Sequence, residues 1–224
     1  MSARPTALIT GASSGIGTAI AAALAPTHAL VLAGRPSPRL RAVADRFGAD
    51  TVALDLGAVH TAVDAAGLPD DLDVLVHNAG VALPARVAES DVAQWRTTME
   101  VNVVGAVGLT LALLPALRRA GGQVVFVNSG SGLRSSPGLA SYSASKAALR
   151  AFADSLREDE PALRVTSVHP GRTDTAMQRT LVDYEGGHYD PARFLRPETV
   201  AAVVADAVAT PPDGHVHQVV LRPR

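Results

Sequence analysis

Several residue types and patterns are missing from the 224-residue chain, and each absence narrows what the protein can do. Cysteine is absent, which excludes disulfide bonds and thiolate metal sites and is compatible with a reducing cytoplasm. No arginine cluster forms a basic stripe, and the net charge is −1 with a pI near 6.6, so we expect no nucleic-acid groove. Lysine is nearly absent: Lys146 is the only one, and every other residue in the Lys+Arg count of 20 is arginine.

Neither a secretory signal nor a membrane span is predicted. The N-terminus enters an apolar run almost at once, without room for a charged region, a hydrophobic region and a cleavage site. The longest apolar stretch, Val101 to Leu117, is shorter than the roughly 20 residues of a membrane helix. It is also interrupted by Asn102, Gly105, Gly108 and Pro115. We expect this stretch to be a buried helix and the protein to be cytoplasmic.

What is present is a regular alternation of short β-rich runs and alanine-rich segments of helical period. Apolar runs without internal alternation are typical of strands that are buried on both faces of a parallel sheet. Seven strands are predicted, in "TALIT", "HALVLA", "TVALD", "DVLVHN", "QVVFVNS", "RVTSVH" and "HQVVL". The predicted helices lie near 15–25, 38–47, 58–66, 90–118, 140–158 and 197–209. This order predicts an α/β fold, with a doubly wound parallel sheet and helices on both faces.

The composition favours a single domain over residues 1–224. Hydrophobic residues make up 47% of the chain and charged residues 18%, which is enough apolar material for one large core. One irregular stretch, 172–196, is rich in Gly, Tyr, His and Arg. A loop of that length in a compact domain is often functional, so we predict that it forms a lid over the substrate.

The segment "TGASSGIG", Thr10 to Gly17, follows the first predicted strand and opens the first predicted helix. Its glycines let the backbone turn sharply and approach a pyrophosphate, which the free N–H groups of a helix N-terminus attract. The alternative is a tight structural turn with an ordinary helix cap. The candidate cofactor-binding residues here are Gly11, Ser13, Ser14, Gly15, Ile16 and Gly17.

Charged residues follow the second and third predicted strands. Enzymes that prefer NAD place an acidic residue after the second strand, whereas Arg35 stands here and can bind a 2′-phosphate with two hydrogen bonds. Arg35 therefore indicates NADPH, with a solvated loop arginine as the alternative and Arg39 as a possible helper. Asp55, followed by Leu56, could accept a hydrogen bond from the adenine amino group or could cap a helix.

Taken in order, the motifs resemble those of the short-chain dehydrogenase/reductase family in its compact, single-domain form. "TGASSGIG" is similar to the cofactor loop of that family, and "NAG" at 78–80 to its motif after the fourth strand. "NVVG" at 102–105 is similar to its catalytic asparagine region. "YSASK" contains its Tyr-x-x-x-Lys pair, with Ser129 thirteen residues upstream. "PG" at 170–171 followed by Thr175 is similar to its nicotinamide-side loop.

The resemblance implies a Rossmann-like sheet, a nicotinamide cofactor and a small carbonyl or alcohol substrate. It implies a catalytic tetrad of Asn102, Ser129, Tyr142 and Lys146. Further cofactor contacts are expected from Asn78, Ala79, Gly80, Tyr142, Lys146, Pro170, Gly171, Thr173 and Thr175. The family habit of pairing long helices also implies a homodimer or homotetramer.

The chain departs from the family pattern in a few places. His77 stands where a second asparagine is common, and Thr173 stands where a β-branched apolar residue is common. The 172–196 segment and the C-terminus are short relative to the family pattern.

The spacing of Tyr142 and Lys146 has a chemical reason. Reduction of a carbonyl needs a hydride at carbon, which a nicotinamide supplies, and a proton at oxygen. A tyrosine can give that proton, but its usual pKa of about 10 is high for exchange at pH 7. An ammonium about 4 Å away attracts the phenolate by about 4 kcal/mol, equivalent to up to about three pKa units. Because residues four apart share a helix face, Lys146 is expected to lower the pKa of Tyr142.

Ser129 and Asn102 are expected to support this pair, each with an alternative. Ser129 would donate a hydrogen bond to the substrate oxygen where charge develops. It could instead be a capping serine, in which case Ser131 would take the donor role. By resemblance, Asn102 would hold a water that connects Lys146 to solvent, unless it is a purely structural asparagine at a helix kink.

The histidines raise the question of a metal site, and we predict none. His215 and His217 alternate on the last predicted strand and so face the same side, but no third ligand accompanies them. His169, beside Pro170, is expected to be a packed residue and not a ligand.

The favoured function is NADP(H)-dependent hydride transfer between a carbonyl and an alcohol, with Tyr142 as general acid and base. A second class of function is a sensing or regulatory protein that binds the cofactor without turnover. A third is a sugar-nucleotide epimerase, but that resembles a longer branch of the family with an added substrate domain. The expected pocket walls do not identify a substrate: Leu133, Leu139, Arg172, Tyr184, His188, Tyr189 and Phe194.

Overall fold

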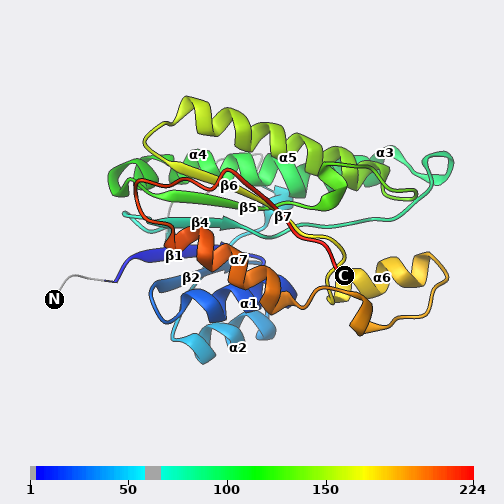
Figure 1. The fold of residues 1–224 in the computed structure, drawn as a ribbon, viewed down its shortest axis with the longest axis horizontal. Helices are drawn as coiled ribbons and strands as arrows, with labels where there is room; N and C mark the ends of the chain where they lie inside the picture. The colour runs from blue at the N-terminus through cyan, green and yellow to red at the C-terminus, as the bar shows by residue number, and fades with distance from the viewer. Residues whose placement is uncertain (1–3, 59–66) are drawn as a thin grey trace.

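The computed structural model describes residues 4–58 and 67–224, which form a parallel sheet with helices on both of its faces (Figure 1). The strand order is β3-β2-β1-β4-β5-β6-β7 and every neighbouring pair is parallel. The strands are β1 Thr6–Thr10, β2 Ala29–Gly34, β3 Asp50–Ala53, β4 Val74–His77, β5 Gln123–Val127, β6 Arg164–His169 and β7 Gln218–Val220. The doubly wound α/β fold that the alternation predicts is therefore confirmed.

The α-helices divide between the two faces of the sheet, as the figure shows (Figure 1). The helices α1, α2 and α7 cover one face, α4 and α5 cover the other, and α6 lies beyond the carboxyl ends of the strands. Their bounds are α1 Gly15–Leu24, α2 Pro38–Phe47, α3 Val92–Met99, α4 Gly105–Ala120, α5 Ala140–Asp159, α6 Ala176–Tyr184 and α7 Pro197–Ala209. The predicted helix at 58–66 falls almost wholly outside the described residues.

Two apolar clusters, one on each face, hold the layers together. Along β1, Ile9 packs with Ile20 of α1 and Val204 of α7, whereas Leu8 packs with Leu109 of α4 on the opposite side. This alternation follows from the period of two in a strand, which sends successive side chains to opposite faces. Each of these five leucine, isoleucine and valine side chains is 0% exposed, and burial of one such side chain contributes about 1.5–3 kcal/mol.

The predicted helix over 90–118 is interrupted. Between α3 and α4 the backbone forms a π-helical turn, Glu100–Val104, whose wider hydrogen bonds place Asn102 on the inner face. By length and composition alone the whole run Val92–Ala120 could cross a membrane. Its inner face is buried on the sheet, while Leu111 on its outer face is 61% exposed, so the helix is only half buried.

The 172–196 segment is not the irregular loop that the composition suggested. It contains α6, which begins where the Thr175 hydroxyl accepts a hydrogen bond from the backbone N–H of Gln178 (3.2 Å). A short 3₁₀ helix, Pro191–Arg193, follows it. The prediction of an irregular segment is therefore wrong, because a capping threonine and the buried Gln178 and Val182 define a helix among residues that look like a loop.

Candidate functional site

The glycine loop between β1 and α1 lies against the end of β4. Gly11 has φ +66, and a Cβ added to it would lie 2.8 Å from the Cα of Ala79. A Cβ on Gly17 would lie 2.3 Å from the carbonyl oxygen of Gly11. Only glycine fits at these positions, so the loop is as close to its neighbours as the backbone allows.

Asn78 and Thr10 fix this loop to the end of β4. The Asn78 side-chain amide donates hydrogen bonds to the carbonyl oxygens of Thr10 and Gly11, each at 3.1 Å. The Thr10 hydroxyl in turn accepts from the backbone N–H groups of Asn78 and Ala79, at 3.0 and 3.1 Å. The first two motifs of the sequence therefore form one hydrogen-bonded unit.

A cavity of about 710 Å³ opens beside this unit. Most of the predicted cofactor-binding residues line it: Gly11, Ser13, Ser14, Gly15, Ile16, Arg35, Asp55, Leu56, Asn78, Ala79, Gly80 and Thr175. Sequence reasoning missed other lining residues, among them Ser37, Val81, Val101 and Met177. Ser37 carried a detectable signal, since it stands directly before Pro38 and caps α2 by accepting from the N–H of Leu40.

Several predicted residues do not line the cavity. Gly17 lies beneath the loop, and Pro170, Gly171 and Thr173 belong to the framework of the chain after β6. There the Gly171 N–H donates to the carbonyl of Leu221 (2.8 Å), and the hydroxyl of Thr173, which is 6% exposed, donates to Gly171 (3.0 Å).

Two charged residues in the cavity have different surroundings. Asp55 caps a turn by accepting from the Gly57 N–H (3.0 Å), the alternative that its sequence position left open. Arg35 is exposed, and no acidic side chain pairs with it among the described residues. Its guanidinium is thus available to an anion at the end of the cavity formed by β2.

Tyr142 and Lys146 lie on the buried face of α5, and Lys146 lies close to Gly80, which follows β4. Tyr142 is 9% exposed and Lys146 is 3% exposed. The Lys146 ammonium donates to the carbonyl of Val127 (3.1 Å) and lies 5.8 Å from the centroid of the Tyr142 ring. A Cβ on Gly80 would be 3.6 Å from the Lys146 Nζ, so the lysine reaches the chain segment that lines the cavity.

The direction of the tyrosine pKa differs from the sequence-based expectation. Burial raises the pKa of the Tyr142 phenol, and a hydrogen bond from the Ser129 side chain opposes that rise. Burial also lowers the pKa of Lys146 to about 8. The expectation that Lys146 lowers the pKa of Tyr142 is wrong, because loss of hydration disfavours the charged form of each group.

Ser129 both caps a turn and contacts the tyrosine, so the two readings of this serine are compatible. Its hydroxyl accepts from the Ser131 N–H (3.1 Å) at the start of the 3₁₀ helix Gly130–Gly132. The same side chain also lies near the Tyr142 phenol, whose pKa it lowers. Ser131, the fallback donor, contributes its backbone to this arrangement.

Asn102 is 1% exposed, and its amide is occupied by protein partners. The Oδ1 atom accepts from the Val81 N–H (2.8 Å), and Nδ2 donates to the Val81 carbonyl (2.9 Å) and to Ser145 Oγ (3.0 Å). Ser145 Oγ in turn donates to the carbonyl of Tyr142 (2.7 Å). The π-turn thereby connects the segment after Gly80 to the first turn of α5, in keeping with the structural alternative.

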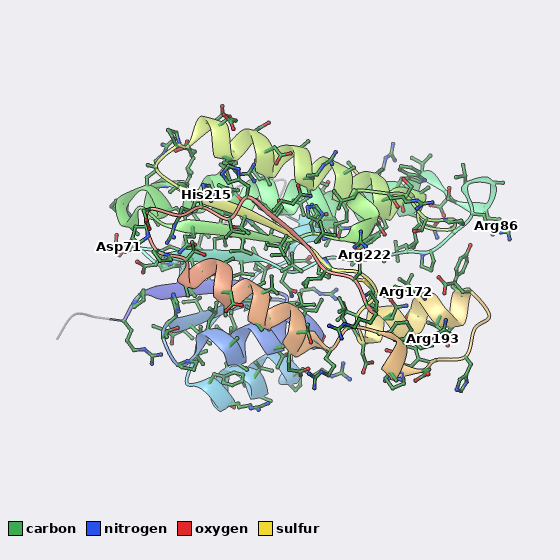
Figure 2. The ribbon with its side chains drawn as sticks, in the orientation of Figure 1. Asp71, Arg86, Arg172, Arg193, His215 and Arg222 are labelled. Atoms are coloured by element: carbon green, nitrogen blue, oxygen red, sulfur yellow. The ribbon has the colours of Figure 1, made fainter. Side chains whose placement is uncertain are left out.

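The predicted lid is held together by its own side chains. Arg172 pairs with Glu185 (2.6 Å) and lies over the Phe194 ring (5.4 Å). Arg179 lies over the Tyr189 ring (4.0 Å), whose hydroxyl donates to Asp174. Figure 2 shows Arg172 and Arg193 beside α6, at the carboxyl end of the sheet. The Tyr184 ring packs on Gly138, where a Cβ would lie 2.7 Å from it.

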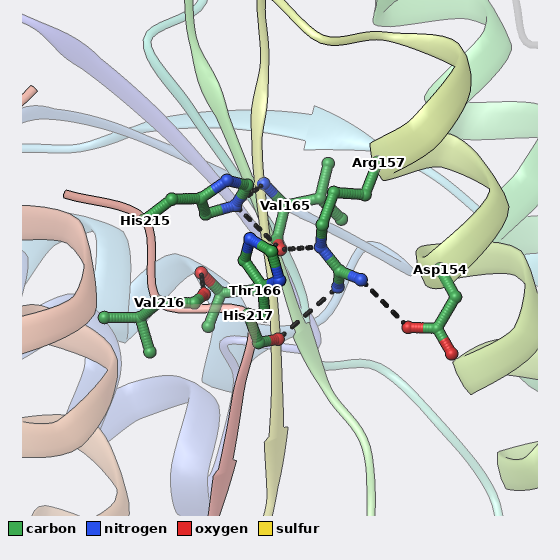
Figure 3. Close-up of polar contacts among 7 residues, drawn as sticks. All are labelled: Asp154, Arg157, Val165, Thr166, His215, Val216 and His217. Atoms are coloured by element: carbon green, nitrogen blue, oxygen red, sulfur yellow. Dashed lines mark hydrogen bonds and ion pairs between the residues drawn. The ribbon is translucent and has the colours of Figure 1, made fainter. Parts of the chain in front are cut away.

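His215 and His217, which were considered as metal ligands, lie beside β6 near the edge of the sheet (Figure 3). Both precede β7, so the prediction that they lie on the last strand is wrong. The Val165 N–H donates to His215 Nε2 (2.7 Å), and Arg157 donates to the Val165 carbonyl (3.0 Å), replacing strand partners that β7 is too short to provide. The described part of the chain holds no group of three potential metal ligands.

Comparison with known proteins identifies relatives over the whole chain. The family model described as short chain dehydrogenase matches residues 5–186. An uncharacterized oxidoreductase of Staphylococcus epidermidis is 33% identical over 227 residues, covering 97% of this chain and 96% of the relative. Among solved structures, an alcohol dehydrogenase of Thermococcus sibiricus in complex with 5-hydroxy-NADP is 29% identical with a TM-score of 0.87, covering 98% of this chain and 96% of that one.

A second solved structure has a similar likeness. A 3-oxoacyl (acyl-carrier-protein) reductase of Agrobacterium tumefaciens with bound NADP is 27% identical, with a TM-score of 0.85, and covers 97% of this chain and 93% of that one.

Proposed function

The chain belongs to the short-chain dehydrogenase family, and from that premise we propose that it is an NADP(H)-dependent oxidoreductase that interconverts a small carbonyl compound and its alcohol. The observation that supports the proposal is the grouping of two buried residues, Tyr142 and Lys146, with the half-buried Ser129. These three residues do not line the cavity themselves, but Lys146 lies beside Gly80, which does.

The cavity fits a dinucleotide for physical reasons. The loop that lines it contains glycines that no other residue could replace without collision, and it leads into the N-terminus of α1. Ser14 precedes that helix without using its side chain to cap it, so its hydroxyl is available to a phosphate oxygen. Residues 11–16 would hold the pyrophosphate, Asp55 and Leu56 the adenine, and Gly80 and Thr175 the nicotinamide side.

Arg35 is the reason for proposing NADP(H) over NAD(H). It lines the cavity, is exposed and has no acidic partner among the described side chains, so its guanidinium can bind a 2′-phosphate through two hydrogen bonds. The solved relatives from Thermococcus sibiricus and Agrobacterium tumefaciens contain 5-hydroxy-NADP and NADP, which supports the choice. We expect Arg35→Asp to lower the preference for NADPH over NADH, measured as the ratio of kcat/KM, by about 10- to 100-fold. An unchanged ratio would remove Arg35 from the cofactor site.

The protein residues divide the remaining chemistry. A nicotinamide cofactor held by residues 11–16, Gly80 and Thr175 would supply the hydride chemistry at the substrate carbon. Tyr142 gives a proton to the substrate oxygen during reduction and takes one during oxidation, while the Ser129 hydroxyl donates a hydrogen bond to that oxygen. Lys146, an ammonium below its pKa of about 8, faces the same space and favours the phenolate that remains after transfer. Asn102 keeps α5 and the segment after Gly80 in register through Ser145 and Val81.

The decisive test is Tyr142→Phe, which removes the hydroxyl and keeps the ring. We expect oxidation of NADPH with a panel of aldehydes and ketones to fall by at least about 10²-fold in kcat, the usual contribution of a general acid. Cofactor affinity, measured by calorimetry, should stay within about threefold. A Tyr142→Phe protein with full activity would refute the mechanism, and wild-type protein that binds NADPH but reduces no carbonyl would favour the sensing function.

We also propose that the protein is a cytoplasmic homo-oligomer. The outer side of the α3–α4 run carries exposed apolar residues, with Leu111 61% exposed and Val104 43% exposed, as an interface between copies would require. Light scattering on purified protein measures the assembly directly, and a monomeric mass would exclude it.

A further inference from the structure

Both backbone polar groups of Ser129 contact a neighbouring side chain. Its N–H donates to Asn128 Oδ1 (2.8 Å), and its carbonyl lies 3.1 Å from His169 Nδ1. The same carbonyl also accepts from the Gly132 N–H (3.0 Å), but that bond lies within the turn and would move with it. The His169 contact is different, because it joins the turn to the last residue of β6.

The position of His169 suits this connection. The backbone of the turn is joined to β6 and its extension on either side of Ser129, by Asn128 N–H to Val168 (2.8 Å) and Gly130 N–H to Pro170 (2.8 Å). Pro170 has no N–H, so the chain after β6 cannot return a backbone hydrogen bond to the turn at this residue. The His169 side chain adds a contact of its own between β6 and the turn, at the Ser129 carbonyl.

The ring has one arrangement of hydrogen bonds that satisfies the carbonyl. A carbonyl oxygen only accepts, so Nδ1 must carry the proton and donate. The other nitrogen, Nε2, is buried and has no hydrogen-bond partner among the described residues. His169 is 0% exposed, and its burial lowers its pKa, which keeps the ring neutral at pH 7.

Charged side chains face the ring from two elements. Arg150 and Asp154 approach from α5, and Arg222 approaches from the chain after β7. Arg222 also covers the turn itself, since a Cβ on Gly130 would lie 2.6 Å from its Nη1 atom. Figure 2 shows Arg222 over this end of the sheet. The two arginines oppose a positive charge on the ring and Asp154 favours one, so the neutral form is consistent with the surroundings as a whole.

We propose that His169 is a positioning residue that acts through Ser129. By donating from Nδ1 to the Ser129 carbonyl, the ring fixes the Ser129–Gly132 turn on β6 and thereby directs the Ser129 hydroxyl at the Tyr142 phenol. The catalytic consequence rests on the proposed function, whereas the effect of Ser129 on the pKa of Tyr142 does not.

Two substitutions distinguish loss of the hydrogen-bond donor from loss of the volume of the His169 ring. His169→Asn keeps a donor, because the amide nitrogen of asparagine stands where Nδ1 stands in histidine, and His169→Leu fills the space without one. His28→Leu, at the amino end of the sheet, serves as the matched control for loss of a histidine. His169→Gln keeps an amide but moves it one carbon further from the backbone, and it replaces the leucine variant if that protein does not fold.

The first readout is the pKa of Tyr142, followed by NMR of labelled tyrosine rings across a pH series, with no cofactor or substrate. The Ser129 hydrogen bond lowers this pKa, so Ser129→Ala should raise it. His169→Leu should raise it in the same direction, and His169→Asn should leave it unchanged. In the Ser129→Ala background, His169→Leu should have no further effect, because the group through which it acts is gone.

The second readout is turnover. We expect His169→Leu to lower kcat for carbonyl reduction about tenfold with NADPH affinity unchanged, since misplacement of a reacting group reduces the rate more than binding. His169→Asn should stay within about threefold of wild type, and His28→Leu should match it.

Two results would overturn the proposal: equal behaviour of the asparagine and leucine variants, or an effect of His169→Leu on Tyr142 that persists without the Ser129 hydroxyl. If wild-type protein reduces no carbonyl, the proposed function fails, while the Tyr142 titration still decides the role of His169.

Discussion

A cavity lies at each end of the sheet, and the polar side chains at the two ends make different kinds of hydrogen bond. At the amino end, a cavity of about 550 Å³ is bordered by His28, Asp73, Gln123 and Arg164. Two of these polar side chains donate to backbone carbonyls at the C-terminal end of α7. Arg164 donates to the carbonyl of Thr210 (2.5 Å), just after the helix, and Gln123 donates to the carbonyl of Val208 (3.0 Å). These bonds satisfy carbonyls that a helix C-terminus leaves free.

At the carboxyl end, the polar groups bind one another, and some of their atoms have no partner. Asn102, Ser145 and Tyr142 form a chain of hydrogen bonds, and Lys146 is buried without an acidic partner among the described residues. Buried atoms without a hydrogen bond, among the described residues, include His77 Nδ1, Asn128 Nδ2 and Ser143 Oγ. Buried polar groups without a partner destabilise a fold, and they are typical of functional sites. Their presence at the carboxyl end therefore favours a reactive site there, whereas the hydrogen bonds at the amino end stabilise the fold.

The largest effect that tests this contrast is expected from Lys146→Arg. The ammonium is enclosed by Val127, Gly80 and Tyr142, and the larger planar guanidinium cannot occupy that space. We expect kcat/KM for carbonyl reduction to fall by about 10²- to 10³-fold, measured from the oxidation of NADPH. Arg150→Lys, an exposed exchange on the same helix, is the matched control and should change activity less than about twofold. A Lys146→Arg protein with activity near wild type would mean that this end of the sheet tolerates change as the other end does.

The next effect is on stability and depends on pH. Burial lowers the pKa of Lys146 to about 8, whereas the unfolded chain keeps this proton until about pH 10.5. Between these values the unfolded state binds more protons, so the free energy of unfolding should rise with pH by up to about 3 kcal/mol. Below pH 8 both states are protonated and the folded protein carries the full cost of the buried charge.

Lys146→Met is the matched comparison for this prediction, since it has no titrating group. Urea unfolding at pH 7.5, 9 and 10 should show the wild type gaining stability relative to Lys146→Met. A difference between the two proteins that stays constant over this range would show that the ammonium is not buried.

The same contrast explains which features could be predicted from sequence. The strands and the glycine loop are local patterns: buried strands appear as apolar runs, and Gly11 and Gly17 stand where the chain must turn. Tyr142 and Lys146 share a helix face because helical spacing requires it. The fold and the position of the proposed site were therefore predictable from the chain.

Features that depend on burial or on distant partners were not predictable. The pKa of Tyr142 depends on how much water its surroundings exclude, which the i, i+4 spacing does not reveal. His169 was expected only to be packed, because its contact with Ser129 joins residues forty positions apart. The helix α6 was missed since its capping bond and its buried face become visible only once it packs.

The smallest expected effect lies at the amino end, with Arg164→Ala. Removal of the guanidinium leaves the carbonyls of Thr210 and Pro211 without this donor and takes a positive charge from the C-terminus of α7. Such a charge contributes up to about 1 kcal/mol, so we expect the free energy of unfolding to fall by roughly that amount. The activity of the remaining folded protein should be unchanged, because the strand length of β6 separates Arg164 from His169 at the other end. Arg41→Ala, an exposed residue of α2, is the control and should alter neither quantity measurably. If Arg164→Ala lowered kcat as well as the free energy of unfolding, the two ends of the sheet would be coupled. The division between a stabilising end and a reactive end would then be wrong.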